Sequence, residues 1–282
     1  MTRNRRRRLV SGLFTGLCGA AVVLALIPLI FILFYLLKKG VGALDLSFFV
    51  RNPRPVGEHG GGFANAIVGT LILIGTAALF AVPVGVTAGL YTAEYRGTRF
   101  AAAIRFAADL LNGVPSIVVG IFAYSVAVLP VKRFSALAGG FALGVMMIPI
   151  VARTTEELLR LVPDALRDGA LALGATRAKA ALSVVLPAAL PGILTGILVA
   201  IARIAGETAP LLFTAFGNRF FSTRLDQPIA ALPIQVYTYA ISPYEEWHRQ
   251  AWAGAFLLVM IILVLSILAR TATRRLERMH RA

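Results

Sequence analysis

Long apolar stretches separated by polar segments are the main feature of this chain. Six can be marked, at about residues 13–37, 64–90, 106–129, 135–152, 193–216 and 252–269. A membrane-spanning helix needs about 20 predominantly apolar residues, so these stretches have the length to cross a bilayer. The first is longer than the apolar core of a cleaved signal peptide, and we expect it to be retained. The pattern predicts an all-α integral membrane protein with six transmembrane helices.

Composition agrees with this class and gives the domain organisation. The chain of 282 residues is 58% hydrophobic and 15% charged, whereas about a quarter of the residues of a soluble domain are charged. We expect a basic N-terminal segment at 1–12, one membrane domain at 13–270 and a basic tail at 271–282. The net charge of +15 does not indicate nucleic-acid binding, because the basic residues flank apolar stretches. We predict membrane lipid, and no nucleic acid, as a partner.

The distribution of basic residues predicts the orientation in the membrane. The N-terminal segment, the turn at 91–105, the segment 152–190 and the C-terminal tail together hold 18 Lys and Arg, against nine in the three segments facing the other side. Cytoplasmic segments carry the excess of Lys and Arg. Both termini and the segment 152–190 are therefore expected in the cytoplasm.

Residues 163–190, between the fourth and fifth stretches, have a different pattern. Pro163 suits the first turn of a helix, where its missing N–H is not needed. One helical face then carries small or apolar residues at i, i+3, i+4 and i+7, namely Leu166, Gly169, Ala170 and Leu173. Such a face allows the close approach of another backbone or of a partner's side chains.

A turn and a second helix are expected to follow. Gly174 suits a helix stop, because glycine adopts the left-handed conformation freely. Thr176 suits the cap of a second helix at 177–185, and Pro187 and Pro191 are expected to end that helix before the next apolar stretch. Residues 163–190, called the finger below, are therefore predicted to form a helix–turn–helix outside the lipid.

The finger resembles a motif of ATP-binding-cassette (ABC) importer permeases, E-A-A-x3-G-x9-I-x-L-P. The matching positions are Asp168, Gly169, Ala170, Gly174, Val184, Leu186 and Pro187. Asp replaces Glu, and Gly replaces the first Ala. In that family the finger is a coupling helix that docks on a separate ATPase subunit, and the fold is the six-helix, MetI-like permease. The resemblance implies an ATPase-coupling role for those seven residues together with Thr176 and Leu182.

Further stretches resemble PstA-type permeases of the phosphate-specific ABC importer. They include G-G-F-A-N-A-I at 61–67, N-G-V-P-S-I-V-V-G at 112–120, R-I-A-G-E-T-A-P-L-L at 203–212 and P-I-A-A-L-P at 228–233. This resemblance implies import of inorganic phosphate across the bacterial cytoplasmic membrane. It also implies a heterodimer with a PstC-type permease, two ATP-binding PstB-type subunits and a phosphate-binding PstS-type protein.

The chain itself carries no sign of an enzyme. It lacks the G-x4-G-K-[ST] motif, so ATP hydrolysis is expected in a partner subunit. Cys18 is its single cysteine, and its three histidines are far apart in the sequence. We expect no metal site and no cofactor.

Two ionisable residues in the fifth apolar stretch point to an anion. Arg203 and Glu207 fall about midway along it, and a charge at such depth usually faces a partner or a pathway, since burying it costs roughly 2.5–3.5 kcal/mol. Their i, i+4 spacing is expected to place both on one helix face. The guanidinium of Arg203 matches phosphate oxygens in shape and charge. Mutual neutralisation of Arg203 and Glu207 is an equally open interpretation.

Four weaker candidates for the substrate path remain open in role. Arg153, at the end of the fourth stretch, either faces the path or is an interface anchor whose charge extends to water. Asn112, Ser116 and Thr208 either line the path or form hydrogen bonds between helices.

Two other functions are compatible with parts of this pattern. Residue chemistry alone does not separate phosphate from another oxyanion or small solute of the same superfamily. A proton-coupled secondary transporter, with Glu207 as its proton site, belongs to another class. The finger favours the importer, because a secondary transporter has no need of an ATPase docking element.

Overall fold

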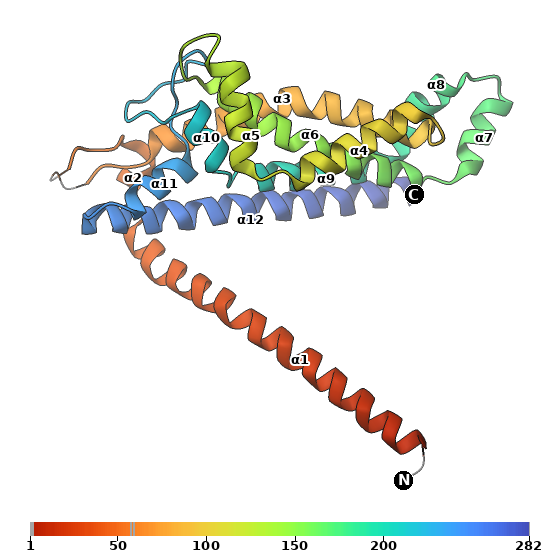
Figure 1. Ribbon diagram of the computed structural model, residues 1–282, viewed down its shortest axis with the longest axis horizontal. Helices are drawn as coiled ribbons and strands as arrows, with labels where there is room; N and C mark the ends of the chain where they lie inside the picture. The colour runs from red at the N-terminus through yellow and green to blue at the C-terminus, as the bar shows by residue number, and fades with distance from the viewer. Residues whose placement is uncertain (1–2, 57, 59, 282) are drawn as a thin grey trace.

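In the computed structural model, which describes residues 3–56, 58 and 60–281, helices form a bundle with one long projecting arm (Figure 1). The helices are α1 Arg3–Tyr35, α2 Leu46–Val50, α3 Ala64–Glu94, α4 Arg99–Gly113, α5 Ser116–Ala123, α6 Ala136–Arg160, α7 Asp164–Ala172, α8 Arg177–Ala180, α9 Leu186–Ile204, α10 Ala209–Thr214, α11 Leu232–Ala240 and α12 Glu245–Arg281. Short π-helical turns extend α1, α5 and α8. The predicted all-α class is confirmed.

Among the described residues, five continuous helices are long and apolar enough to cross a membrane. They cover Val10–Ala43, Ala64–Glu94, Ala136–Arg160, Arg177–Ile204 and Glu245–Leu268. The third predicted span, at about 106–129, is not one straight helix, because α4 meets α5 and its π-turn at an angle of 107°. Pro115 explains the break, since proline disfavours a helical conformation in the preceding residue. Val114 is accordingly extended, with ψ of 130°.

The fifth predicted span is also interrupted. α9 ends at Ile204, residues 205–208 are not helical, and α10 begins at Ala209. The break contains Gly206, and Pro210 lies in the first turn of α10, where proline starts a helix more readily than it continues one. A single hydrophobic run therefore folds as a long helix followed by a short one.

Both interrupted helices still carry the chain through the bundle. α3 and α6 end beside the finger, where Arg167 of α7 reaches Glu94 and the carbonyl of Leu159. α6 begins at the other end of the bundle, where the amide of Ser135 donates to the carbonyl of Thr214. The α4–α5 pair must return the chain between these ends. We call them the finger end and the far end; in Figure 1 they lie at the right and left.

Small residues allow α3, α6 and α9 to pack closely. A Cβ at Gly85 would lie 2.7 Å from Cβ of Val151, and one at Gly89 would lie 2.5 Å from the carbonyl oxygen of Ala152. A Cβ at Gly192 of α9 would lie 2.9 Å from the side chain of Leu158 in α6. Close backbone approach of this kind is the usual basis of helix association in membranes.

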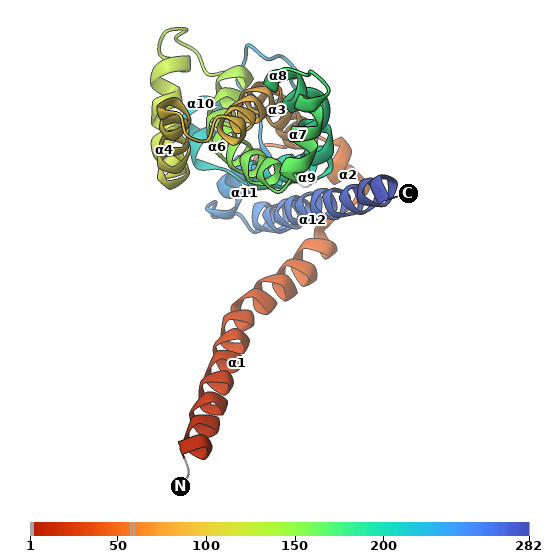
Figure 2. The ribbon, with the colours of Figure 1, turned by 90° about the vertical axis from the view of Figure 1, so that its right-hand side faces the viewer.

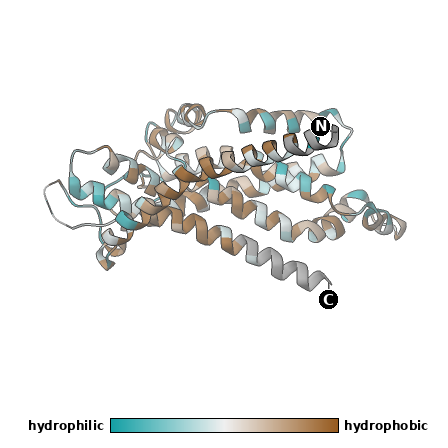
Figure 3. Cartoon of the chain, turned by 90° about the horizontal axis from the view of Figure 1, so that it is seen from below, coloured by the Kyte–Doolittle hydropathy of each residue, from teal (hydrophilic) through white to brown (hydrophobic). Residues whose placement is uncertain are grey.

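α1 stands apart from the bundle as an arm. Figure 2 shows it extending away from the other helices, and Figure 1 shows that it leaves them near the far end. Only 6% of its most apolar 18-residue segment is buried. Leu24 is 70% exposed. Apolar residues also dominate the middle of α12 (Figure 3). Surfaces of this kind belong against lipid or another apolar protein surface.

Candidate functional site

The two helix breaks lie beside each other. α5 packs on α10, and a Cβ at Gly120 would lie 2.8 Å from Cα of Pro210 and 3.2 Å from the ring of Phe213. Gly120 is one turn beyond the first break, and Pro210 is just beyond the second. The fold thus brings together two non-helical turns from distant parts of the chain. Irregular backbone at membrane depth is tolerated where it is covered by protein or lines a cavity.

All but one of the predicted path residues lie at these breaks. Asn112 is in the last turn of α4, and Ser116 is the first residue of α5. Arg203 is in the last turn of α9, and Glu207 and Thr208 lie between α9 and α10. Arg203 and Asn112 are exposed in the single chain, while the other three are half-buried. Polar side chains therefore gather where the helices are interrupted.

The predicted helical relation between Arg203 and Glu207 is wrong. α9 ends at Ile204, so the two residues do not share one helix face; the amide of Glu207 donates to the carbonyl of Ile204 in a turn. Within the part of the chain that the structure describes, Arg203 and Glu207 form no ion pair with each other. The guanidinium of Arg203 is therefore available to another group.

Arg153 has carboxylate partners instead. Its Nε donates to Asp109 over 2.9 Å, its Nη1 lies 3.4 Å from Oε2 of Glu156, and a second contact reaches Asp109. The side chain is 29% exposed. Arg153 is thus held between α4 and α6, which differs from an interface anchor whose charge extends freely to water.

Glu156 is the centre of an ion-pair network that the sequence pattern did not reveal. Its side chain is 3% exposed and accepts a 2.6 Å hydrogen bond from Nε of Arg105. Arg153 and Arg160 approach it from its own helix. Arg105 also donates to the carbonyl of Thr92 at 2.8 Å. The network joins α3, α4 and α6 at the finger end.

The finger has the predicted helix–turn–helix form. Pro163 precedes α7, and Gly174 has φ of +85°, the left-handed conformation expected of it. The hydroxyl of Thr176 caps α8 by accepting from the amide of Lys179 over 3.3 Å. α7 and the α7–α8 turn extend beyond the helix ends (Figure 1).

The predicted end of the second finger helix is wrong. α8 continues through a π-helical turn into α9, so one helical segment runs from Arg177 to Ile204. Pro187 lies in the first turn of α9, and Pro191 lies inside it. Proline removes one backbone hydrogen bond from a helix. A π-helical turn beside it lets the freed backbone groups find other partners, and proline is tolerated in membrane helices for this reason. The finger is therefore continuous with a membrane-spanning helix.

Most of the residues predicted to couple to the ATPase are exposed. α7 has no buried residue, and a Cβ at Gly169 would meet no atom within 4 Å. The exposed members of the predicted set are Asp168, Gly169, Gly174, Thr176, Leu182 and Pro187, and the half-buried ones are Ala170, Val184 and Leu186. Leu173, at the tip, is 91% exposed. The finger presents a surface without a partner in this single chain.

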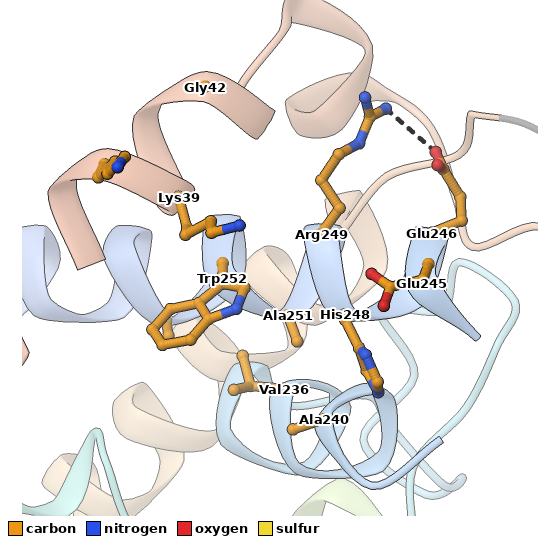
Figure 4. A pocket seen from close by; sticks show the side chains of 12 residues that line it. Lys39, Gly42, Val236, Ala240, Glu245, Glu246, His248, Arg249, Ala251 and Trp252 are labelled. Carbon is orange, nitrogen blue, oxygen red and sulfur yellow. Dashed lines mark hydrogen bonds and ion pairs between the residues drawn. The ribbon is translucent and has the colours of Figure 1, made fainter. Parts of the chain in front are cut away.

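A cavity of about 850 Å³ lies elsewhere, at the far end between the end of α1 and the start of α12 (Figure 4). Its lining mixes charges, with Lys38, Lys39 and Arg249 facing Glu245 and Glu246. Glu246 and Arg249 are already paired at 3.1 Å. None of the predicted path residues lines it, so this cavity is not the candidate path.

Comparison with known proteins defines the class. Residues 85–281 match the family model described as "Binding-protein-dependent transport system inner membrane component". The chain belongs to this family, and it is a multi-pass membrane permease, a transport subunit and not an enzyme.

Its relatives within the family share one name. The "Phosphate transport system permease protein PstA" of Haemophilus influenzae is 45% identical over 265 residues, covering 94% of each chain. The protein of the same name from Yersinia pestis is 46% identical, covering 89% of this chain and 85% of its own. A probable PstA from Methanocaldococcus jannaschii is 37% identical over 95% of both chains. The chain is therefore a member of the PstA group of permeases.

Solved structures support the fold. A chain of the MetNI methionine ABC transporter in an inward-facing conformation aligns with a TM-score of 0.58 at 21% identity, covering 76% of this chain and 94% of its own. A chain from an amino acid ABC transporter aligns with a TM-score of 0.56 at 18% identity. The MetI-like ABC permease fold predicted from the sequence is confirmed.

Proposed function

We propose that this chain forms half of the translocation path of an ATP-driven importer of inorganic phosphate. The observation that carries the proposal is its 45% identity to a phosphate permease along 94% of both chains. The site adds a physical reason, because the cationic Arg203, which has no ion-pair partner among the described residues, lies at a helix break. Guanidinium groups suit phosphate oxygens in both charge and geometry.

The substrate path is proposed to pass the two helix breaks. Discontinuous membrane helices supply substrate sites in many transporters, where the helix N-termini favour anionic groups. Here α5 begins at Ser116, and Thr208 directly precedes α10. Arg203 and Asn112 are exposed in the single chain, which suits a path shared with a second permease. Glu207 completes the proposed lining at the breaks, and Arg153, which Asp109 and Glu156 hold, would line the path nearer the finger end.

Transport is proposed to be driven through the finger. Its exposed surface, which includes Asp168 and Gly169, would dock on one of two ATP-binding PstB-type subunits. ATP would favour the state in which the two fingers of the permease pair lie close together, and the path would then open outward. ATP can drive this shift only through its higher affinity for that closed state.

The assembly and orientation follow from the same proposal. A PstC-type permease would pair with this chain, and a PstS-type protein would deliver phosphate from outside. The finger end would face the cytoplasm of a bacterium, together with both termini, because the segments on this side hold twice as many basic residues as the opposite ones. The far end would face outward.

Radiolabelled phosphate uptake tests this function. Cells lacking the chain should take up phosphate from micromolar solutions poorly, and expression of the chain together with its three partners should restore uptake. Excess unlabelled phosphate should abolish the signal, and excess sulfate should leave it unchanged. Competition by sulfate would instead favour a permease for another oxyanion. Uptake that persists without any ATPase subunit, and follows the proton gradient, would favour a secondary transporter.

A further inference from the structure

Arg167 differs from the rest of α7, because its side chain points back into the bundle. Its side chain is only 13% exposed, on a helix that has no buried residue. Its neighbour Asp168, which belongs to the coupling motif, is exposed. The two consecutive residues thus face opposite ways, one towards the bundle and one towards solvent.

The guanidinium of Arg167 is bound by four acceptors, which lie on α3, on α6, in the loop between α6 and α7, and on α7 itself. Its Nη2 donates to the carbonyl of Leu159 at 2.7 Å, and its Nη1 donates to the carbonyl of Val162 at 2.9 Å. Its Nε donates to Glu94, the last residue of α3, at 3.1 Å, and Nη1 also reaches Asp164 at 2.9 Å. A planar, five-donor group holds several acceptors in fixed directions.

These bonds tie the finger to the most closely packed helix pair. Glu94 ends α3, and Leu159 lies in the last turn of α6, so both helices are held through one side chain. Glu94 is itself only 16% exposed, which limits screening of the pair by solvent. Leu159, Val162 and Ala93 form an apolar cluster directly beneath. A finger without these hydrogen bonds could change its orientation without moving α3 or α6.

We infer that Arg167 is the positioning residue that makes α7 move as one body with α3 and α6. This inference rests on the proposed coupling function of the finger. Displacement of α7 by an ATPase would then move α3 and α6 together, and Glu156 would carry the motion to α4 through Arg105. Without Arg167 the finger would still bind the ATPase. Its displacement would then bend the connection between α6 and α7 and would not move α3 and α6.

The test compares three variants in the assembled, reconstituted importer. Arg167→Gln removes the charge and most of the donors. Arg167→Lys keeps the charge but loses the planar fork. Arg99→Gln is the matched control, because Arg99 is an exposed basic residue outside the finger, and its side chain forms no hydrogen bond or ion pair among the described residues. Assembly, ATP hydrolysis and phosphate uptake are measured for each.

We expect Arg167→Gln to assemble and hydrolyse ATP, but to move about two- to thirty-fold less phosphate per ATP, the usual range for mutations that alter coupling. Arg167→Lys should be intermediate, and Arg99→Gln should match the unmodified chain. A residue needed only for folding would lower the amount of complex and leave phosphate per ATP unchanged. An unchanged ratio in a fully assembled Arg167→Gln complex overturns the inference.

A distance measurement keeps this test separate from the proposed function. Spin labels are placed at Leu173→Cys in the finger and Gly97→Cys beyond α3, in a Cys18→Ser background. Arg167→Gln should broaden the distribution of distances between them, and Arg99→Gln should not. A distribution that stays narrow overturns the inference, whatever is transported. If the unmodified complex fails to move phosphate, the proposed function fails instead, and the distance distribution still decides the role of Arg167.

Discussion

The buried carboxylate of Glu156 accepts a 2.6 Å hydrogen bond from Nε of Arg105, and this pair joins α6 to α4. Four other ion pairs lie at the same end of the bundle. They are Arg153–Asp109, Arg153–Glu156, Arg160–Glu156 and Arg167–Glu94. The charged residues that the structure pairs most fully are therefore near the finger and not at the helix breaks. This division suits a chain that transmits movement at one place and admits an anion at another.

Removal of the Glu156 carboxylate should destabilise the protein strongly. Glu156→Ala leaves three arginines without their shared acceptor, and breaking a buried ion pair costs about 3–5 kcal/mol. Glu157→Ala is the matched control, because Glu157 is the exposed neighbour on the same helix and such changes are usually within about 0.5 kcal/mol. Thermal unfolding in detergent compares the two. Equal unfolding temperatures would show that the network contributes little to stability.

Close packing of α3 on α6 gives a second stability prediction. Gly89→Ala places a methyl group 2.5 Å from the carbonyl of Ala152, and overpacking of this kind costs about 1–3 kcal/mol. Gly75→Ala, on the same helix, meets no atom within 4 Å and should be neutral or slightly stabilising, since alanine favours helix over glycine by about 0.5–1 kcal/mol. Thermal unfolding of both variants checks the difference. A Gly89→Ala protein as stable as Gly75→Ala would contradict this packing.

The turn of the finger depends on backbone conformation alone. Gly174 has φ of +85° and no atom near its missing side chain, so Gly174→Val brings strain without a clash, about 1–2 kcal/mol for the left-handed conformation. We expect Gly174→Val to insert in the membrane but to lose phosphate uptake and the response of its ATPase. Gly174→Asn should retain much of both, because asparagine tolerates this conformation. Full uptake by Gly174→Val would remove the finger from the coupling mechanism.

Orientation in the membrane is tested by cysteine labelling. Thr176 in the finger and Glu245 at the far end are both exposed, so single cysteines at these positions in a Cys18→Ser background should be accessible. In intact cells a membrane-impermeant reagent should label Glu245→Cys, and it should label Thr176→Cys only after the cells are opened. Labelling of Thr176→Cys in sealed cells would reverse the proposed orientation.

Local signals explain what the sequence predicted well. The finger is determined by residues next to each other in the chain, namely the Pro163 start, the Gly174 stop and the Thr176 cap, and the structure confirms all three. Hydropathy also located the spans, because a helix that crosses the bilayer must be predominantly apolar along its whole length.

The two helix breaks were missed for the same reason. Hydropathy averaged over an apolar stretch does not reveal where the chain changes direction within it. Pro115 and the glycine and proline of 206–210 are the residues that indicate the two breaks. Contacts such as Arg105–Glu156 and Arg167–Glu94 join residues 51 and 73 positions apart. Their pairing is set by how the helices pack, which no periodicity in a single sequence specifies.

The role of Arg203 is the central claim, and substitution of both charges at the break tests it most directly. Arg203 and Glu207 lie on either side of the end of α9 without an ion pair between them, so Glu207 is not expected to need Arg203 as a counter-ion. Phosphate uptake is measured at equal expression for Arg203→Gln, Arg203→Lys and the double variant Arg203→Gln with Glu207→Gln. We predict that Arg203→Gln loses at least about tenfold in uptake, the value of one charge-assisted hydrogen bond, and that Arg203→Lys keeps part of it. The double variant should stay as inactive as Arg203→Gln while assembling normally with its ATPase. Recovery of uptake in the double variant would contradict this role and make Arg203 a structural partner of Glu207.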